Sequence, residues 1–322
     1  MFKIGARIFA AAMLGTLVNV AAAASFPERP ITVVTPFPAG GATDALTRVL
    51  AEHMSKTLGQ TLIVENRAGA ATTIGASYAA REKPDGYTVL LATNSTLVTN
   101  RFLYKTLSYD PDAFAPIGMI GIGPMVLLSS KKHGFKKPAD VVGYAKKNPD
   151  ALSIASFGAG TSSHLAAEYF QQVADINMLH VPFKGSTQAL PQLISGDIDL
   201  FFDMVSTGMP QVDGGKVDVL AITSKERLSS LPDLPTLSES GYPDFEMTAW
   251  FSLVAPQATP PAVTATLRKA LQTALQDKTV RKRLLDMGIE PGDGSAEALA
   301  KQISTESPVI DALVKRANIV VQ

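Results

Sequence analysis

Two short segments of this chain have glycine and small polar residues directly ahead of a predicted helix. One spans residues 39–43 after the apolar run ITVVT, and the other spans residues 158–162 after the run LSIAS. The N-terminus of a helix carries unpaired backbone N–H groups and about half a positive charge, so each segment can receive an anionic oxygen. The pattern favours carboxylate binding, and its occurrence twice predicts two lobes that face one ligand.

Neither segment is specific for a nucleotide. The second lacks the lysine of a phosphate-binding P-loop, and neither has the three-glycine spacing of a dinucleotide fingerprint. A strand–glycine–helix turn also occurs in α/β proteins merely to reverse the chain. The recurrence of the pattern about half a chain apart is the feature that favours a common ligand.

Three further candidate residues follow predicted strands. Phe37 stands between two prolines just ahead of the first segment, where its ring could line a cleft or cap the core beneath it. Asn94 and Ser95 follow the predicted strand TVLLAT, at the carboxyl end where open α/β sheets usually bind ligands. An ordinary polar turn is the alternative for this pair.

The segment GDIDLFFD contains three aspartates. Strand alternation predicts Asp197 and Asp199 on one face of a strand that leads to Asp203. Either all three are edge and turn carboxylates, or Asp203 faces a cleft and accepts hydrogen bonds there. A calcium loop would need more oxygen ligands and a glycine inside it.

His164 lies one helical turn ahead of Glu168, a spacing that could hold a metal or a catalytic base. The sequence has four histidines and no HExxH motif, so we predict a solvated or capping contact and no metal site. No GxSxG motif accompanies Ser162, which disfavours a serine hydrolase. An exported hydrolase or lyase that uses His164 with Asp203 stays open as a rival function.

The elements that must position these residues alternate along the chain. Apolar residues repeat at helical spacing over residues 46–58 and 165–173. The predicted caps are Thr43 or Asp44 for the first helix and Thr161 or Ser162 for the second. Apolar runs predict strands at residues 31–35, 62–64, 88–92, 117–122, 126–130, 152–155, 179–181, 200–202, 217–223 and 251–255. This alternation is typical of α/β lobes with mainly parallel sheets.

The chain must pass between two lobes more than once, because one glycine segment lies near its start and the other near its middle. We expect crossings near residues 121–126 and 248–253. The predicted organisation is a first lobe of residues 25–124 and 249–322, with residues 125–248 inserted as the second lobe. Two crossing strands of this kind suit a hinge that closes on a ligand.

Residues 1–24 are typical of a secretory signal peptide. Lys3 and Arg7 precede an apolar stretch that ends in Ala22-Ala23-Ala24, so we predict cleavage after Ala24 and export of the chain. An uncleaved membrane anchor is the alternative, although the stretch is short for a bilayer span of about 20 residues.

Composition excludes several classes of function. The 29 basic and 29 acidic residues balance, and no basic block occurs, so nucleic acid is not an expected partner. The absence of cysteine excludes disulfides, thiolate nucleophiles and cysteine-based zinc sites. A chain of 322 residues with 46% apolar content can be stabilised by core burial alone, and its length favours two lobes.

Six motifs in order carry a family resemblance. They are PFPAGGATD, ENRAGAATTIGA, PDGYTVLLATNST, FAPIGMIG, HVPFKGSTQALPQLISGDIDLFFD and AITSKERLSSLPDLPTLSESGYPDFEMTAWFSLVAP. Together they resemble the Bug or TctC family of extracytoplasmic solute receptors, over essentially the whole chain that follows the signal segment. The resemblance implies an α/β periplasmic binding protein of Venus-flytrap type, with two α/β lobes joined by two crossover strands.

The same resemblance implies a function. It is that of a monomeric, non-enzymatic receptor without a cofactor, which captures a small carboxylate and delivers it to a membrane permease of one large and one small subunit. A ligand-sensing adaptor that docks on a signalling membrane protein is the alternative.

The resemblance also implies which residues bind the ligand. These are Phe37, Ala39, Gly40, Gly41 and Thr43 in the first loop, Asn94 and Ser95 in a further turn, and Gly160, Thr161, Ser162, His164 and Asp203 in the opposite lobe. One departure concerns Ala71 and Thr72, which stand where relatives often carry a run of glycines. That region is expected to border the cleft, so the departure leaves the size of the ligand open.

Overall fold

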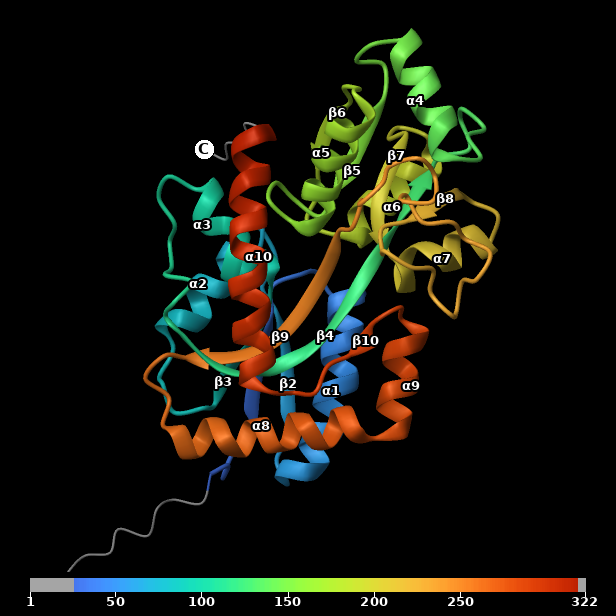
Figure 1. Ribbon diagram of the computed structural model, residues 1–322. Helices are drawn as coiled ribbons and strands as arrows, with labels where there is room; N and C mark the ends of the chain where they lie inside the picture. The colour runs from blue at the N-terminus through green and yellow to red at the C-terminus, as the bar shows by residue number, and fades with distance from the viewer. Residues whose placement is uncertain (1–25, 318–322) are drawn as a thin grey trace, which may run out of the picture.

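The computed structural model describes residues 26–317, so the predicted signal peptide lies outside the described residues. Helices and strands alternate along most of the chain (Figure 1). The strands are β1 (Ile31–Thr35), β2 (Leu62–Asn66), β3 (Thr88–Thr93), β4 (Phe114–Ser129), β5 (Ser153–Ser156), β6 (Leu179–Pro182), β7 (Leu200–Met204), β8 (Asp218–Ile222), β9 (Thr248–Pro256) and β10 (Glu290–Pro291). The helices are α1 (Ala42–Leu58), α2 (Thr73–Arg81), the π-helical turn η1 (Ser95–Thr99), α3 (Asn100–Leu103), α4 (Pro138–Lys147), α5 (Ser162–Ala174), α6 (Ser186–Ser195), α7 (Val205–Asp213), α8 (Pro261–Gln276), α9 (Lys278–Asp286) and α10 (Ala296–Ala317).

The strands pair in the order β2-β1-β3-β9-β4-β7-β5-β6, and β8 and β10 also pair with β4. β1 is parallel to β2 and β3, and β5 is parallel to β6 and β7. Every pairing that involves β4 or β9 is antiparallel. The prediction of mainly parallel sheets was therefore wrong, because the strand that leaves the first group of strands and the strand that returns to it run in opposite directions.

β4 connects the two halves of this arrangement. Its first part, from Phe114 to Pro124, pairs with β9, and its last part, from Met125 to Ser129, pairs with β7 and β8. Two separate strands were expected here, but the Gly-Pro pair between them does not end the strand. In Figure 1, β4 and β9 run side by side between the two groups of helices.

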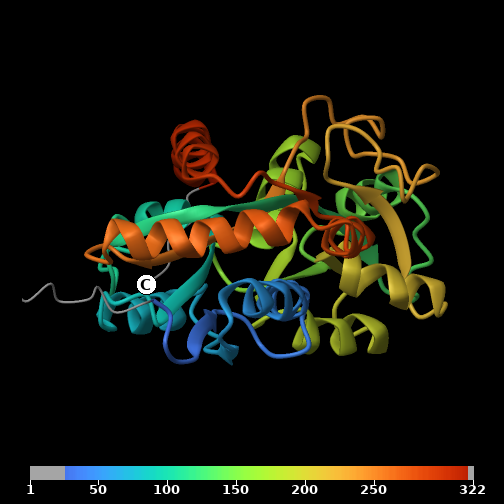
Figure 2. The ribbon, with the colours of Figure 1, turned by 90° about the horizontal axis from the view of Figure 1, so that it is seen from below.

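The helices cover both halves. α1 packs on β2 and α8, while α10 packs along β4 and also contacts α5 of the other half. Seen from below, α8 lies between α10 and α1 (Figure 2). Because α5 follows β5 directly, the glycine segment at residues 158–162 lies between a strand end and a helix start, as the sequence predicted.

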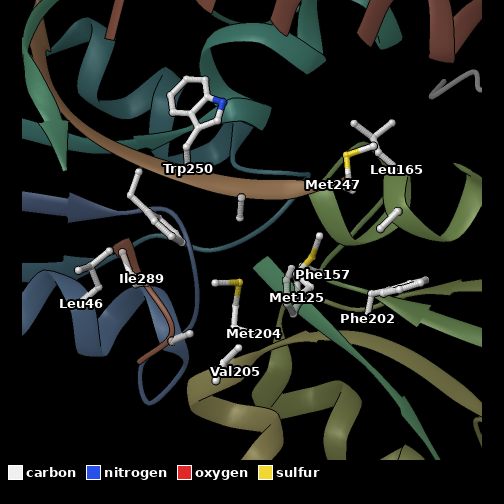
Figure 3. Packing of buried hydrophobic residues seen from close by; sticks show 14 of the residues in the cluster. Leu46, Met125, Phe157, Leu165, Phe202, Met204, Val205, Met247, Trp250 and Ile289 are labelled. Atoms are coloured by element: carbon white, nitrogen blue, oxygen red, sulfur yellow. The ribbon is translucent and has the colours of Figure 1, made fainter. Parts of the chain in front are cut away.

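Buried aromatic rings fill the core of the second half. Phe170 meets Phe202 edge-on with ring centroids 6.2 Å apart, and Phe202 stacks on Phe245 at 6.5 Å. All three side chains are less than 2% exposed, and burying each contributes about 1.5–3 kcal/mol. Phe157 and Met204 lie close together between the two halves (Figure 3).

Candidate functional site

A pocket with about 470 Å³ of empty space, part of it open to solvent, lies where loops of the two halves meet. Its first-half wall includes Gly41, Ala42 and Thr43 at the start of α1, with Asn94 and Ser95 after β3. Its second-half wall includes Ser162 at the start of α5, and Ser186 and Thr187 at the start of α6. We call this space the amide pocket, because the starts of three helices open into it.

Several backbone N–H groups at these helix starts have no hydrogen-bond acceptor within residues 26–317. None of α1, α5 and α6 has a side-chain hydrogen bond from its cap residue. Within residues 26–317, the N–H groups of Ala42, Ser162 and Ser186 donate to no protein acceptor. Each helix start also carries about half a positive charge, so the pocket favours an anion.

A buried hydroxyl points to the same conclusion. Thr93 lines the pocket, is 3% exposed, and its Oγ1 has no hydrogen-bond partner among the described residues. A buried polar atom without a partner is disfavoured, so this hydroxyl is suited to donate to a ligand oxygen.

The side chains that line the amide pocket carry no formal charge. The lining contains no Asp, Glu, Lys or Arg, and its polar side chains are hydroxyls and the amide of Asn94. The Asn94 Nδ2 group donates to Glu306 Oε1 of α10 at 3.4 Å, and Glu306 itself does not line the pocket. An anion would therefore be held by N–H and hydroxyl donors.

Asp203 lies behind the pocket wall and does not line it. Its side chain is fully buried, and its carboxylate accepts from Ser186 Oγ at 2.5 Å and from Thr207 Oγ1 at 2.9 Å. Burial raises the pKa of Asp203 to about 7, although these two hydroxyls act in the opposite direction. Asp203 was expected to face the ligand. It instead lies behind Ser186, whose hydroxyl it orients through this hydrogen bond.

His164 supports the loop ahead of α5. Its Nδ1 accepts from the Gly160 N–H at 3.0 Å, and its ring stacks on His180 with centroids 3.8 Å apart. His164 Nε2 also lies 3.4 Å from Glu168 Oε1, one turn further along α5, so this pair is a contact within the helix and caps neither of its ends. Burial, with a smaller effect from His164, lowers the pKa of His180 to about 3.

The twelve predicted site residues divide into two groups. Those that line the amide pocket are Phe37, Gly41, Thr43, Asn94, Ser95 and Ser162. Those that do not line it are Ala39, Gly40, Gly160, Thr161, His164 and Asp203. Several of the second group use their donors within the protein: Gly40 N–H donates to Asp44 Oδ2 at 3.0 Å, and Thr161 Oγ1 donates to the Gly158 carbonyl at 2.8 Å.

Two other expectations need correction. The cap of α1 is Gly41 rather than Thr43 or Asp44, and Asp44 instead holds the loop ahead of the cap. β7 begins at Leu200, so Asp197 and Asp199 lie ahead of the strand and share no strand face. Among the described residues there is no group of three or more His, Cys, Asp or Glu side chains that could hold a metal ion.

Sequence reasoning missed the third helix start, at Gly185, Ser186 and Thr187. The signal was present, because KGSTQAL repeats the pattern of a strand, a glycine and a hydroxyl-bearing helix start. The strand ahead of it was expected at residues 179–181, but only one glycine follows it, whereas the two segments that were recognised hold two glycines each. The unpaired Thr93 hydroxyl could not be found from sequence, because its lack of a partner depends on packing.

Comparison with known proteins gives the same picture. The family described as "Tripartite tricarboxylate transporter family receptor" (TctC) matches residues 46–319. The structure of the periplasmic binding protein BugD is 38% identical, with a TM-score of 0.88, and the match covers 92% of this chain and 100% of BugD.

Two further similar structures contain ligands. R. palustris Rpa4515 with adipate is 33% identical, has a TM-score of 0.89, and matches over 92% of this chain and 99% of its own. MatC from Rhodopseudomonas palustris with bound malate is 33% identical, has a TM-score of 0.85, and matches over 90% of this chain and 100% of its own. The predicted periplasmic-binding-protein fold is thus confirmed.

These matches also decide between an enzyme and a receptor. The family consists of binding receptors, so the hydrolase or lyase that would use His164 with Asp203 is not supported. None of the helices between residues 26 and 317 combines the length and the apolar character that crossing a bilayer requires. The chain therefore belongs to the TctC family, the solute receptors of tripartite tricarboxylate transporters, and is a binding protein of periplasmic type.

Proposed function

We propose that this protein captures a small organic acid in the amide pocket, between two lobes, and delivers it to a membrane permease of one large and one small subunit. The lobes are residues 25–124 with 249–322, and residues 125–248. The signal segment is removed after Ala24, and the receptor works in the periplasm as a monomer.

The observation that carries this proposal is the set of unused donors in an uncharged pocket. Three helix starts and the Thr93 hydroxyl offer hydrogen bonds that no protein acceptor takes among the described residues. A carboxylate would accept several of these bonds at once and would also interact favourably with the helix dipoles. The adipate of Rpa4515 and the malate of MatC are ligands of the same chemical class.

The energetics suit reversible capture. Three or four hydrogen bonds to a charged group, at about 1.5–3 kcal/mol each, supply roughly 5–12 kcal/mol before the entropy of association is subtracted. Micromolar binding corresponds to about 8 kcal/mol. No arginine is needed to reach that affinity.

Thermal unfolding in the presence of mono-, di- and tricarboxylates tests the proposal. A ligand at about 100 times its Kd adds about 2.7 kcal/mol, which raises Tm by roughly 5–10 °C in a protein of this size. We expect such a shift with at least one acid. A panel of acids that leaves Tm unchanged would contradict the proposed function.

The position of the site is tested with Gly41→Val. Gly41 has a φ of −84°, which suits any residue, and an added Cβ would meet only the Pro38 carbonyl at 3.5 Å. The larger side chain should occupy the pocket without straining the backbone and should abolish the Tm shift. Gly143→Val on α4, where nothing lies within 4 Å, is the matched control and should keep it.

Export and delivery have separate tests. The exported chain should begin at Ser25 when its N-terminus is sequenced. Membrane vesicles that hold a tripartite tricarboxylate permease should take up the labelled acid only when the receptor is added. Uptake that is the same without the receptor would favour the sensing adaptor.

A further inference from the structure

A second space adjoins the amide pocket. It encloses about 970 Å³, part of it open to solvent, and we call it the outer cavity. Phe37 and Phe157 line both spaces, so these two residues lie where the spaces adjoin. A ligand with one end in the amide pocket would extend past these two rings into the outer cavity.

The outer cavity differs from the amide pocket in charge. Lys184 is among its lining residues, whereas no cation lines the amide pocket. Lys184 is exposed, and its ammonium group makes no ion pair with any residue between 26 and 317. The Lys184 N–H donates to Gln188 Oε1 at 3.2 Å, which fixes a polar side chain beside it.

The opposite wall is a backbone turn in an unusual conformation. Ala70, Ala71 and Thr72 have φ values of +45°, +47° and +77°, in the left-handed region that residues with a Cβ rarely adopt. Neighbouring side chains hold the turn by its carbonyl oxygens. Asn100 Nδ2 donates to the Ala71 carbonyl at 2.8 Å, and the Tyr104 hydroxyl donates to the Ala70 carbonyl at 3.3 Å.

The N–H groups of this turn have no such partners. Ala71 and Thr72 are 7% and 1% exposed, yet their N–H groups donate to no acceptor within the described part of the chain. Buried backbone donors are almost always paired in folded proteins. The turn also immediately precedes α2, whose N-terminus adds a favourable dipole.

We propose that the ligand is a dicarboxylate, and that its second carboxylate binds in the outer cavity between the N–H groups of Ala71 and Thr72 and the ammonium group of Lys184. The proposal rests on the proposed function, because the first carboxylate occupies the amide pocket. It assigns to Lys184 the role of distinguishing a diacid from a monoacid. It also explains the strained backbone at Ala70, Ala71 and Thr72 as a conformation that presents two N–H groups to the ligand.

The test compares diacids with monoacids of equal length by titration calorimetry. The diacids are succinate, glutarate, adipate and pimelate, and the monoacids are butyrate, valerate, hexanoate and heptanoate. For at least one length we expect the diacid to bind about tenfold more tightly or better. Lys184→Met should remove most of that advantage, while it changes the affinity for the matching monoacid less than about twofold.

Lys225→Met is the matched control, because Lys225 is an exposed lysine that lines neither space. It should leave both affinities unchanged. Monoacids that bind as tightly as diacids, or a Lys184→Met variant that weakens both equally or neither, would overturn the assignment of the outer cavity while the proposed function stands. If no acid of either series or of the wider panel binds, it is the proposed function that fails.

Discussion

At the scale of single residues, the amide pocket depends on donors that the protein itself leaves unpaired. Thr93 is the clearest case, since its hydroxyl is buried and has no acceptor among residues 26–317. In the unliganded protein this hydroxyl contributes nothing to stability and carries a desolvation penalty. The Thr93 hydroxyl should contribute favourably only to ligand binding, when a ligand oxygen accepts its hydrogen bond.

Thr93→Val tests that point. The change keeps the shape of the side chain and removes the hydroxyl, so the free energy of unfolding should stay equal or rise slightly. The affinity for the acid should fall about tenfold or more, because a hydrogen bond to a charged group is worth about 1.5–3 kcal/mol. Thr99→Val is the control, since the Thr99 hydroxyl is also buried and unpaired but does not line the pocket. Equal loss of affinity in both variants would refute the role of Thr93.

Asp203 makes stability depend on pH. Its pKa is raised to about 7 in the folded protein from an ordinary value of 3.8, chiefly by burial. Between these values the folded chain holds the proton and the unfolded chain has lost it, so this group lowers the free energy of unfolding as pH rises. The full effect is on the order of 4 kcal/mol by pH 8. Relative to the wild type, Asp203→Asn should therefore gain stability between pH 4 and pH 8 in urea unfolding.

Asp199 is a control for Asp203, because its pKa is shifted in the opposite direction. Burial raises its pKa, but donors from Ser153, His133 and Lys132 together outweigh burial and lower it. Such a group stabilises the folded state above its unfolded pKa, so Asp199→Asn should lose stability relative to the wild type as pH rises. A pH-independent difference for Asp203→Asn would show that Asp203 is ionised in the fold at all these pH values.

At the scale of elements, the two crossing strands β4 and β9 depend on close packing against the segment around β10. A Cβ atom at Gly121 in β4 would lie 2.5 Å from the Glu290 carbonyl oxygen and 2.9 Å from Ile289 Cγ2. Figure 3 labels Ile289 among the buried hydrophobic residues around β9. Only glycine allows these backbones to approach so closely.

Gly121→Ala should therefore reduce the free energy of unfolding by about 1–3 kcal/mol, because the backbone must move to admit a methyl group. Gly143→Ala, in an open position on α4, should instead raise it by about 0.5–1 kcal/mol. Urea unfolding of the two variants measures both effects. A Gly121→Ala variant as stable as the wild type would mean that β10 does not pack as described.

The C-terminal helix α10 reaches the site through the partly buried carboxylate of Glu306. Glu306 accepts from Trp250 Nε1 in β9 and from Asn94 Nδ2 beside the amide pocket. Burial raises the pKa of Glu306 above its ordinary 4.5, against the effect of its donors Trp250, Gln302 and Asn94. Trp250 is the sole tryptophan of the chain, so its emission should titrate at a pH above 4.5 in the wild type. The same titration in Glu306→Gln would assign the signal to another group.

Much of this element level could be predicted from the sequence. The helical repeats over residues 46–58 and 165–173 and most strand positions are confirmed, because their signals are local periodicities. The antiparallel pairing of β4 and β9 could not be predicted, because residues far apart in sequence decide which strands become neighbours. The strand ahead of α6 was predicted, but the α6 start was missed because Gly185 is a single glycine and a weaker signal than the two glycines in each of the recognised segments.

At the scale of the whole molecule, β4 and β9 connect two halves of the chain (Figure 1). Helix starts from both halves line the amide pocket. Loops of the two halves touch across that space, since an added Cβ at Gly185 would lie 3.1 Å from Pro38 Cδ and one at Gly40 would lie 3.9 Å from Thr187 Cγ2. We infer that the ligand enters when the halves part about these strands and that it then bridges them, as hinge closure requires.

The crystal structure of the protein with the organic acid that it binds most tightly tests this account most directly. We predict a carboxylate in the amide pocket that accepts hydrogen bonds from the start of α1 on one side and from the start of α5 or α6 on the other, with the Thr93 hydroxyl as a further donor. A ligand bound outside that pocket, or held by one half alone, would contradict the account.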